Sequence, residues 1–255
     1  MNWNEPIDQF CERMDSGLWA EPLNAVSNAA FLVAAGFAYA LWRRTVPRDL
    51  PVLILILLVF AVGIGSFLFH TFALRWAWFA DVVPIGLFIA GYLVLALVRN
   101  LGLGLATAIV WLVAFEAVVV TFTLALPPDF INRAVPYLPA LAALWLIGFL
   151  LRWRATGADD AGRSSQQAKR DRATARAFFL AAGLFTLSLL FRIVDLEFCS
   201  ALPSGTHFLW HILNALVLYV LLFAAIRHHG AKRDRGGPDP RLQRPAAGVF
   251  EEGGR

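Results

Sequence analysis

Seven apolar segments constrain the fold of this chain more than any other feature, because each is long enough to cross a membrane. A helix needs about 20 apolar residues to span the hydrocarbon core. The segments cover residues 23–42, 51–69, 77–98, 103–126, 134–151, 177–196 and 207–226. Lipid offers the backbone no hydrogen-bond partners, so each segment must be a helix. The sequence therefore predicts an all-α fold, a polytopic membrane protein built as a bundle of seven transmembrane helices.

The composition agrees with a membrane protein and excludes several other classes. Hydrophobic residues make up 59% of the chain and charged residues only 16%, against about 45–50% and about 25% in soluble domains. With two cysteines, the chain is not a disulfide-rich secreted scaffold. Its positive net charge comes from basic residues between the apolar segments, which indicates topology rather than nucleic-acid binding. We therefore predict the bilayer as a partner and no nucleic acid, and the sequence identifies no protein partner.

The basic residues also predict an orientation. If the chain alternates sides through seven crossings, one side receives eighteen Lys and Arg residues and the other three. The positive-inside rule places the eighteen in the cytoplasm, the N-terminus outside and the C-terminus inside. Three regions follow: an acidic outer segment at 1–22, a membrane domain at 23–226 and a disordered basic tail at 227–255. The cytoplasmic loop 152–176 is polar and is expected to be flexible.

Ionisable residues are rare within the apolar segments and mark candidate functional positions. They are His70, Asp81, Glu116, Arg192, Asp195, His207 and His211. At about 1.5 Å per residue, the three histidines and Asp81 all fall within roughly 10 Å of the predicted outer face. The sequence assigns no role to the other three.

The spacing of the four residues at matched depth predicts a catalytic zinc site. His207 and His211 lie one helical turn apart on the same face, where they can share a metal with His70. Catalytic zinc takes three protein ligands and lowers the pKa of a water at the fourth position. Asp81 is placed to accept a proton from that water, and Ser66, one turn before His70, to stabilise an oxyanion. The alternatives are interfacial histidines and a serine bonded to its own helix.

Three other classes of membrane protein fit poorly. A retinal protein needs a lysine in the bundle, but the two lysines, Lys169 and Lys232, lie in the loop and the tail. A rhomboid-type protease needs a Gly-x-Ser-Gly motif, and Phe67 follows Ser66 here. Transporter sites lie near the midplane, whereas this polar cluster lies near one face.

Several motifs resemble the alkaline ceramidase family, within the seven-helix superfamily that includes the adiponectin and progestin receptors. They are Ser66-Phe67-Leu68-Phe69-His70, Asp81 and His207-Phe208-Leu209-Trp210-His211, together with segments 11–28 and 195–199. The resemblance implies a zinc amidase that cleaves the N-acyl bond of ceramide, with His70, His207 and His211 as zinc ligands. The main alternative is a receptor-like protein of the same superfamily that binds a lipid. A third is a structural protein with a zinc staple, which would need neither Ser66 nor Asp81.

The resemblance also implies a calcium site and a disulfide near the N-terminus. Glu12, Asp15 and Glu21 are the candidate calcium ligands, although Gln9 stands where an acid is expected. The alternative is that these carboxylates belong to a solvated acidic face. Cys11 and Cys199 are both predicted to lie outside, where a disulfide can form; the alternative is two free thiols.

The use of arginine over lysine, 20 residues against 2, favours a bacterial origin. The expected location is then the inner (plasma) membrane, with the active site near its outer face. Because bacteria often lack ceramide, the substrate is expected to be ceramide or a related N-acyl lipid.

Overall fold

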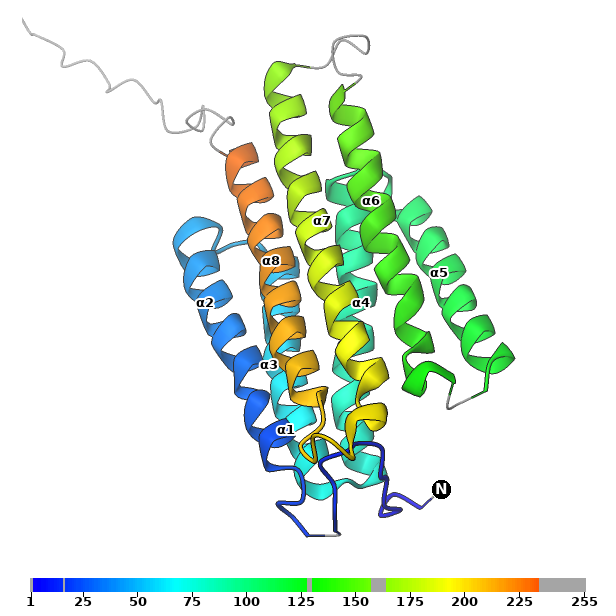
Figure 1. Cartoon of the computed structure of the whole chain (residues 1–255). Helices are drawn as coiled ribbons and strands as arrows, with labels where there is room; N and C mark the ends of the chain where they lie inside the picture. Colours follow the sequence, from blue (N-terminus) through cyan, green and yellow to red (C-terminus); the bar gives the residue numbers. More distant parts are fainter. Residues whose placement is uncertain (1, 16, 128–129, 157–163, 234–255) are drawn as a thin grey trace, which may run out of the picture.

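The computed structural model describes residues 2–15, 17–127, 130–156 and 164–233, and it is helical almost throughout (Figure 1). The α-helices are α1 (Pro22–Ser27), α2 (Ala29–Thr45), α3 (Leu50–Phe72), α4 (Arg75–Arg99), α5 (Leu105–Ala125), α6 (Leu138–Thr156), α7 (Ser165–Val194) and α8 (His207–Arg233). Short 3-10 turns, η1 (Phe130–Arg133), η2 (Val135–Tyr137) and η3 (Leu196–Phe198), lie in the connections.

Within the described residues, these elements form seven spans that are long and apolar enough to cross a membrane, which confirms the predicted seven-helix fold. The first span, Pro22–Thr45, joins α1 and α2. A break at Asn28 separates the two helices, and the Asn28 side chain donates a hydrogen bond to the carbonyl oxygen of Asn24 (2.9 Å).

The expected loop 152–176 is shorter in the structure, which corrects the predicted boundary. Helix α6 continues to Thr156, and α7 begins at Ser165. The Ser164 side chain caps α7 by accepting a hydrogen bond from the backbone N–H of Gln167 (3.2 Å). The segment is polar, but Ala, Gln, Lys and Arg, which make up most of it, all favour helix. Residues 157–163 lie outside the described residues.

The predicted tail is also partly helical. Helix α8 continues to Arg233, seven residues beyond the predicted end of the last span at residue 226. The rest of the tail, 234–255, lies outside the described residues.

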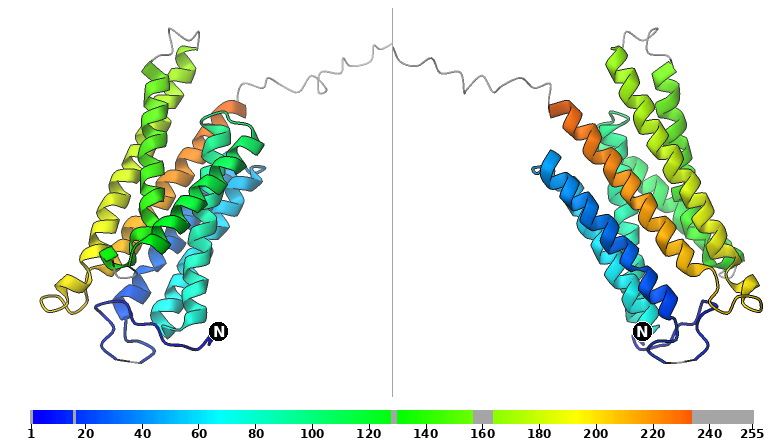
Figure 2. Two further views of the ribbon diagram at one scale, coloured as in Figure 1. Left: turned by 90° about the vertical axis from the view of Figure 1, so that its right-hand side faces the viewer. Right: turned by 60° about the vertical axis from the view of Figure 1, so that its left-hand side comes forward.

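The N-terminal segment and the connection between α7 and α8 lie at the same end of the bundle (dark blue and yellow in Figure 2). The basic ends of α2, α4, α6 and α8 lie at the opposite end (Figure 1). The apolar core lies between α2, α3, α4, α6, α7 and α8, and α5 is the least buried span. Exposed leucines and valines on α5, such as Val110 and Leu124, are suited to face lipid.

Helices α3 and α4 cross in very close contact at Gly65. A methyl group added at Gly65 would lie 1.9 Å from the backbone carbonyl oxygen of Ala80. Only glycine permits this approach. The next residues along the two helices are Ser66 and Asp81, and both side chains line the same cavity.

We expect Gly65→Ala to force the two helices apart and to lower the thermal stability and activity of the protein strongly, by overpacking at backbone atoms that cannot move aside. Gly183→Ala on α7 is the matched control, because nothing lies within 4 Å of the added methyl. Alanine should be neutral or slightly stabilising there. Thermal unfolding of both variants in detergent measures the difference, and equal melting temperatures would contradict this account of the crossing.

Candidate metal centre and active site

Three histidines converge at the N-terminal end of the bundle. His70 lies near the end of α3, and His207 and His211 form one face of the first turns of α8. One ring nitrogen from each lies within 4.8 Å of the others, and all three side chains are buried. Within the described part of the chain, this is the group of side chains able to hold a metal ion.

The hydrogen bonds around the rings fit metal ligation. Nδ1 of His70 lies 2.5 Å from Oε2 of Glu21, and Nδ1 of His211 lies 2.7 Å from Oγ of Ser27. These bonds leave Nε2 of both rings available to the centre, as in metal sites where an outer partner fixes the tautomer of the ligand. Nδ1 of His207 is buried and has no hydrogen-bond partner among the described residues. The donor set therefore fits a metal ion that binds imidazole nitrogen.

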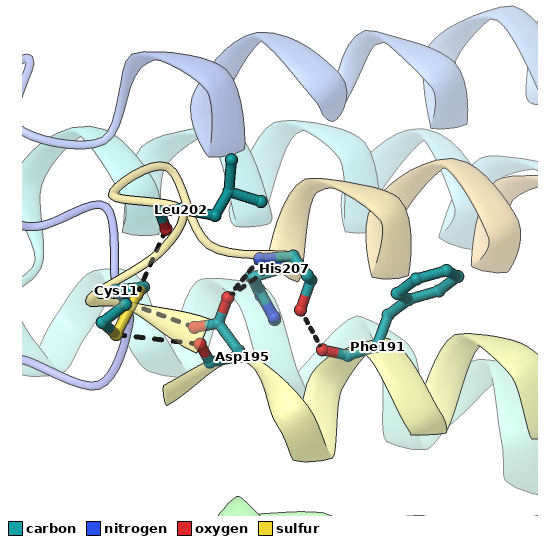
Figure 3. The surroundings of a disulfide bond; sticks show 7 residues. Cys11, Phe191, Asp195, Leu202 and His207 are labelled. Atoms are coloured by element: carbon teal, nitrogen blue, oxygen red, sulfur yellow. Dashed lines mark hydrogen bonds between the residues drawn. A yellow bond between two sulfur atoms is a disulfide. The ribbon is translucent and has the colours of Figure 1, made fainter. Parts of the chain in front are cut away.

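Asp195 fixes the start of α8, where two of the histidines lie. Its carboxylate accepts hydrogen bonds from the backbone N–H groups of Thr206 (2.7 Å), His207 (2.9 Å) and Cys11 (3.1 Å) (Figure 3). It thus caps the helix N-terminus and also holds the N-terminal segment against it. The sequence assigned no role to Asp195, because Cys11 lies far along the chain from Thr206 and His207.

The Cys11–Cys199 disulfide lies beside Asp195 and ties the N-terminal segment to the connection between α7 and α8 (Figure 3). Their Cα atoms are 5.3 Å apart. Phe10, the residue before the bridge, stacks on the His207 ring with 3.8 Å between ring centroids. The disulfide therefore keeps an aromatic cover over the histidine cluster.

We expect loss of the disulfide to lower stability and to loosen this cover. The bridge joins residues 188 positions apart, and in the chain-entropy model such a closure stabilises by up to about 5 kcal/mol. Peptide mapping without reduction should recover the Cys11–Cys199 pair, and Cys199→Ser should melt at a lower temperature. Two freely alkylated thiols in correctly inserted, unreduced protein would contradict the bridge.

Ser66 and Asp81 lie beside the histidine cluster, in the wall of a narrow cavity of about 100 Å³ that His211 also lines. The rest of this wall is almost entirely apolar and comes from α2 to α8, with Tyr137 of η2. The structure thus brings Ser66 and Asp81 together with the three histidines, although it does not test their predicted roles.

Asp81 also borders a second, wider cavity of about 390 Å³, lined by His207 and by three charged residues that the sequence left unassigned or outside the site. They are Glu116 from α5, Arg133 from η1 and Arg192 from α7. The Arg192 guanidinium lies 5.2–5.7 Å from the ring centroids of Trp210, Tyr137 and Phe10. The depth of a residue along its helix could not reveal this grouping, because the grouping depends on how each helix is rotated about its own axis.

The predicted calcium site has no support in the arrangement of its three carboxylates. Glu12 accepts hydrogen bonds from the backbone N–H groups of Leu23 (2.7 Å) and Asn24 (2.8 Å) at the start of α1. Asp15 accepts one from the backbone N–H of Gly17 (2.6 Å).

Glu21 is paired with two protein groups. Its side chain is almost fully buried and contacts Arg13 (2.6 Å) and His70 (2.5 Å). Burial alone would raise the pKa of Glu21, but the hydrogen bonds and charges of His70 and Arg13 outweigh it and lower the pKa below its usual value.

A family model for ceramidases matches residues 7–238 of the chain. The protein belongs to the Ceramidase family. The match includes all seven spans, the three histidines, Ser66, Asp81 and both cysteines. No curated protein sequence matches the chain. Membership of the Ceramidase family identifies a hydrolase that acts on a lipid amide bond, and the three buried histidines are compatible with a metal-dependent ceramidase.

Proposed function

We propose that this ceramidase is a zinc-dependent hydrolase that cleaves the N-acyl bond of ceramide or a related N-acyl lipid, releasing a fatty acid and a sphingoid base or other amine. One observation carries the proposal: His211, one of the three clustered and buried histidines, lines an apolar cavity that also presents Ser66 and Asp81. A structural metal staple would need neither of these two side chains nor a cavity.

Each residue around the histidine cluster has a separate role in the hydrolysis. Zinc held by the three histidines supplies positive charge that polarises an amide carbonyl and makes water more acidic. Asp81 takes up the proton of the attacking water and delivers it to the leaving amine. The Ser66 hydroxyl donates a hydrogen bond to the oxygen that gains negative charge as the carbonyl is attacked. Glu21 and Ser27 keep the His70 and His211 rings in the orientation that ligation needs.

The two cavities suggest how the substrate lies. The narrow cavity has an apolar wall suited to the acyl chain. The wider one carries Glu116, Arg133 and Arg192 and suits the polar amine portion. Because both cavities border Asp81, the scissile amide would lie between them, next to the histidine cluster.

We further propose that the N-terminus lies outside and the active site near the outer face of a bacterial plasma membrane. The basic helix ends lie opposite the histidine cluster, in agreement with the positive-inside rule. Labelling of single cysteines introduced at residue 3 and residue 234 of a Cys11→Ser/Cys199→Ser background, with a membrane-impermeant reagent on intact cells, should modify the first position only. Modification of residue 234 alone would reverse the orientation.

The hydrolase proposal is tested with purified protein in detergent and a panel of N-acyl lipids. The panel varies acyl-chain length and the amine portion separately, and released fatty acid is measured by mass spectrometry. We expect release with zinc-loaded protein, no release after zinc is stripped, and recovery when zinc is returned. Folded, zinc-loaded protein that binds these lipids without turnover would overturn the proposal.

A further inference from the structure

Arg13 provides a positive charge inside the N-terminal segment, directly behind the histidine cluster. The segment is held in place by backbone bonds to the turn between α3 and α4, including Ile7 N–H to the carbonyl of Ala73 (2.8 Å), and by the disulfide at Cys11. The Arg13 side chain is only 7% exposed. A buried guanidinium remains charged and needs a partner to offset its desolvation.

That partner is Glu21, and the pair reaches the predicted metal ligand by two routes. Nε of Arg13 donates to Oε1 of Glu21 (2.6 Å), while Oε2 of Glu21 lies 2.5 Å from Nδ1 of His70. Nη2 of Arg13 also donates to the backbone carbonyl of His70 (3.4 Å). One guanidinium therefore holds both the carboxylate that orients the imidazole and the backbone that carries it.

The remaining contacts complete the surroundings of Glu21. The Asn24 side-chain amide donates to Oε2 of Glu21 (3.2 Å), and Nη1 of Arg13 donates to the backbone carbonyl of Asp15 (3.5 Å). Both carboxylate oxygens thus have partners within the protein. The arrangement resembles a site built around a cation, with the guanidinium as that cation.

We propose that Arg13 is a positioning residue that holds Glu21 and His70 in the geometry required for metal binding, so that the centre forms without a second metal ion in the acidic N-terminal segment. Arg13 acts through Glu21 and does not itself touch the metal or substrate. The inference rests on the proposed zinc function of His70. Beyond that function, the inference assigns the Arg13 guanidinium as the positive charge that holds Glu21 in place.

The test compares metal binding in wild-type protein, Arg13→Met and Arg13→Lys. Zinc affinity is measured by chelator competition, and ligand geometry by the visible spectrum of Co²⁺-substituted protein. Loss of such an outer contact typically weakens metal affinity about 10–100-fold. We expect that loss and an altered Co²⁺ spectrum in Arg13→Met. Arg13→Lys should fall between Arg13→Met and wild type, because it keeps the charge but not all the donors.

Arg75→Met is the matched control. Arg75 pairs with Glu5 in the same segment, and its side chain is 28% exposed. This variant loses the same charge without touching Glu21, and it should keep wild-type affinity and spectrum. Adding Ca²⁺ or a calcium-selective chelator should change neither quantity in the wild type.

Wild-type affinity and spectrum in folded Arg13→Met would overturn the proposal, as would equal losses in Arg75→Met. If Arg13→Met does not fold, folded Arg13→Lys decides: a weaker affinity with a changed spectrum supports the role, and wild-type values overturn it. A calcium requirement for zinc binding in the wild type would also overturn it. These readouts do not depend on the lipid, so the hydrolase proposal fails separately, through a wild-type protein that binds no zinc or releases no fatty acid.

Discussion

Replacing His211 with alanine is expected to remove the bound metal and abolish lipid hydrolysis. The three histidines form a compact, buried set, and the two that remain cannot complete a three-ligand site. The wild type should contain about one zinc ion per chain, whereas His211→Ala should contain almost none after dialysis. Zinc content and fatty-acid release, measured on the same preparations, check this expectation.

Two further substitutions separate metal ligation from general damage to α8. His228→Ala makes the same change near the other end of the same helix, and it should keep both metal and activity. Ser27→Ala removes the partner of Nδ1 of His211 but leaves the ligand in place. It should weaken zinc binding about 10–100-fold. Full zinc retention in all three single variants, His70→Ala, His207→Ala and His211→Ala, would rule out the proposed site.

Asp81→Asn is expected to keep the metal and lose most of the turnover. The amide has nearly the same shape as the carboxylate but cannot take up a proton, and general acid–base catalysis typically contributes about 10²–10⁴-fold to the rate. Ser66→Ala should cost about 10²–10³-fold, since it removes one hydrogen bond to the developing oxyanion. Neither side chain belongs to the three-histidine set, so zinc content should remain near the wild-type value.

The measurement is the rate of fatty-acid release at saturating lipid, alongside zinc content. Asp171→Asn is a suitable control, because Asp171 is another helical aspartate with a buried side chain but lies near the start of α7, at the opposite end of the bundle. Wild-type turnover in both Asp81→Asn and Ser66→Ala would show that the mechanism is wrong even if zinc is bound.

The sequence was sufficient to predict the seven-helix fold, because a membrane restricts the structures that an apolar segment can form. An apolar run of about 20 residues in lipid has to be a helix, and seven such runs give the seven spans found in the structure. The ends of the helices were less predictable. Ser165–Arg176 is polar enough to resemble a loop, yet it is capped by Ser164 and rich in helix formers, so it extends α7.

The depth of each residue in the membrane could also be predicted from the sequence, because a helix rises by a fixed distance per residue. That rise placed His70, Asp81, His207 and His211 at one level, and the structure brings them to the same end of the bundle. The two cysteines were predicted on the same side because the chain changes sides at each crossing, and they form the disulfide of the structure.

Only the tertiary structure decided which side chains face one another. The rotation and packing of the helices bring Glu21 to His70, Ser27 to His211, and Glu116 and Arg192 to the cavity that Asp81 borders. The approach of α3 and α4 at Gly65 likewise depends on two distant segments. The acidic N-terminal residues illustrate the difference best: the family resemblance implied calcium there, but packing placed the Arg13 guanidinium against Glu21. Composition specifies which charges are present, whereas the partner of each charge depends on contacts between residues far apart in the chain.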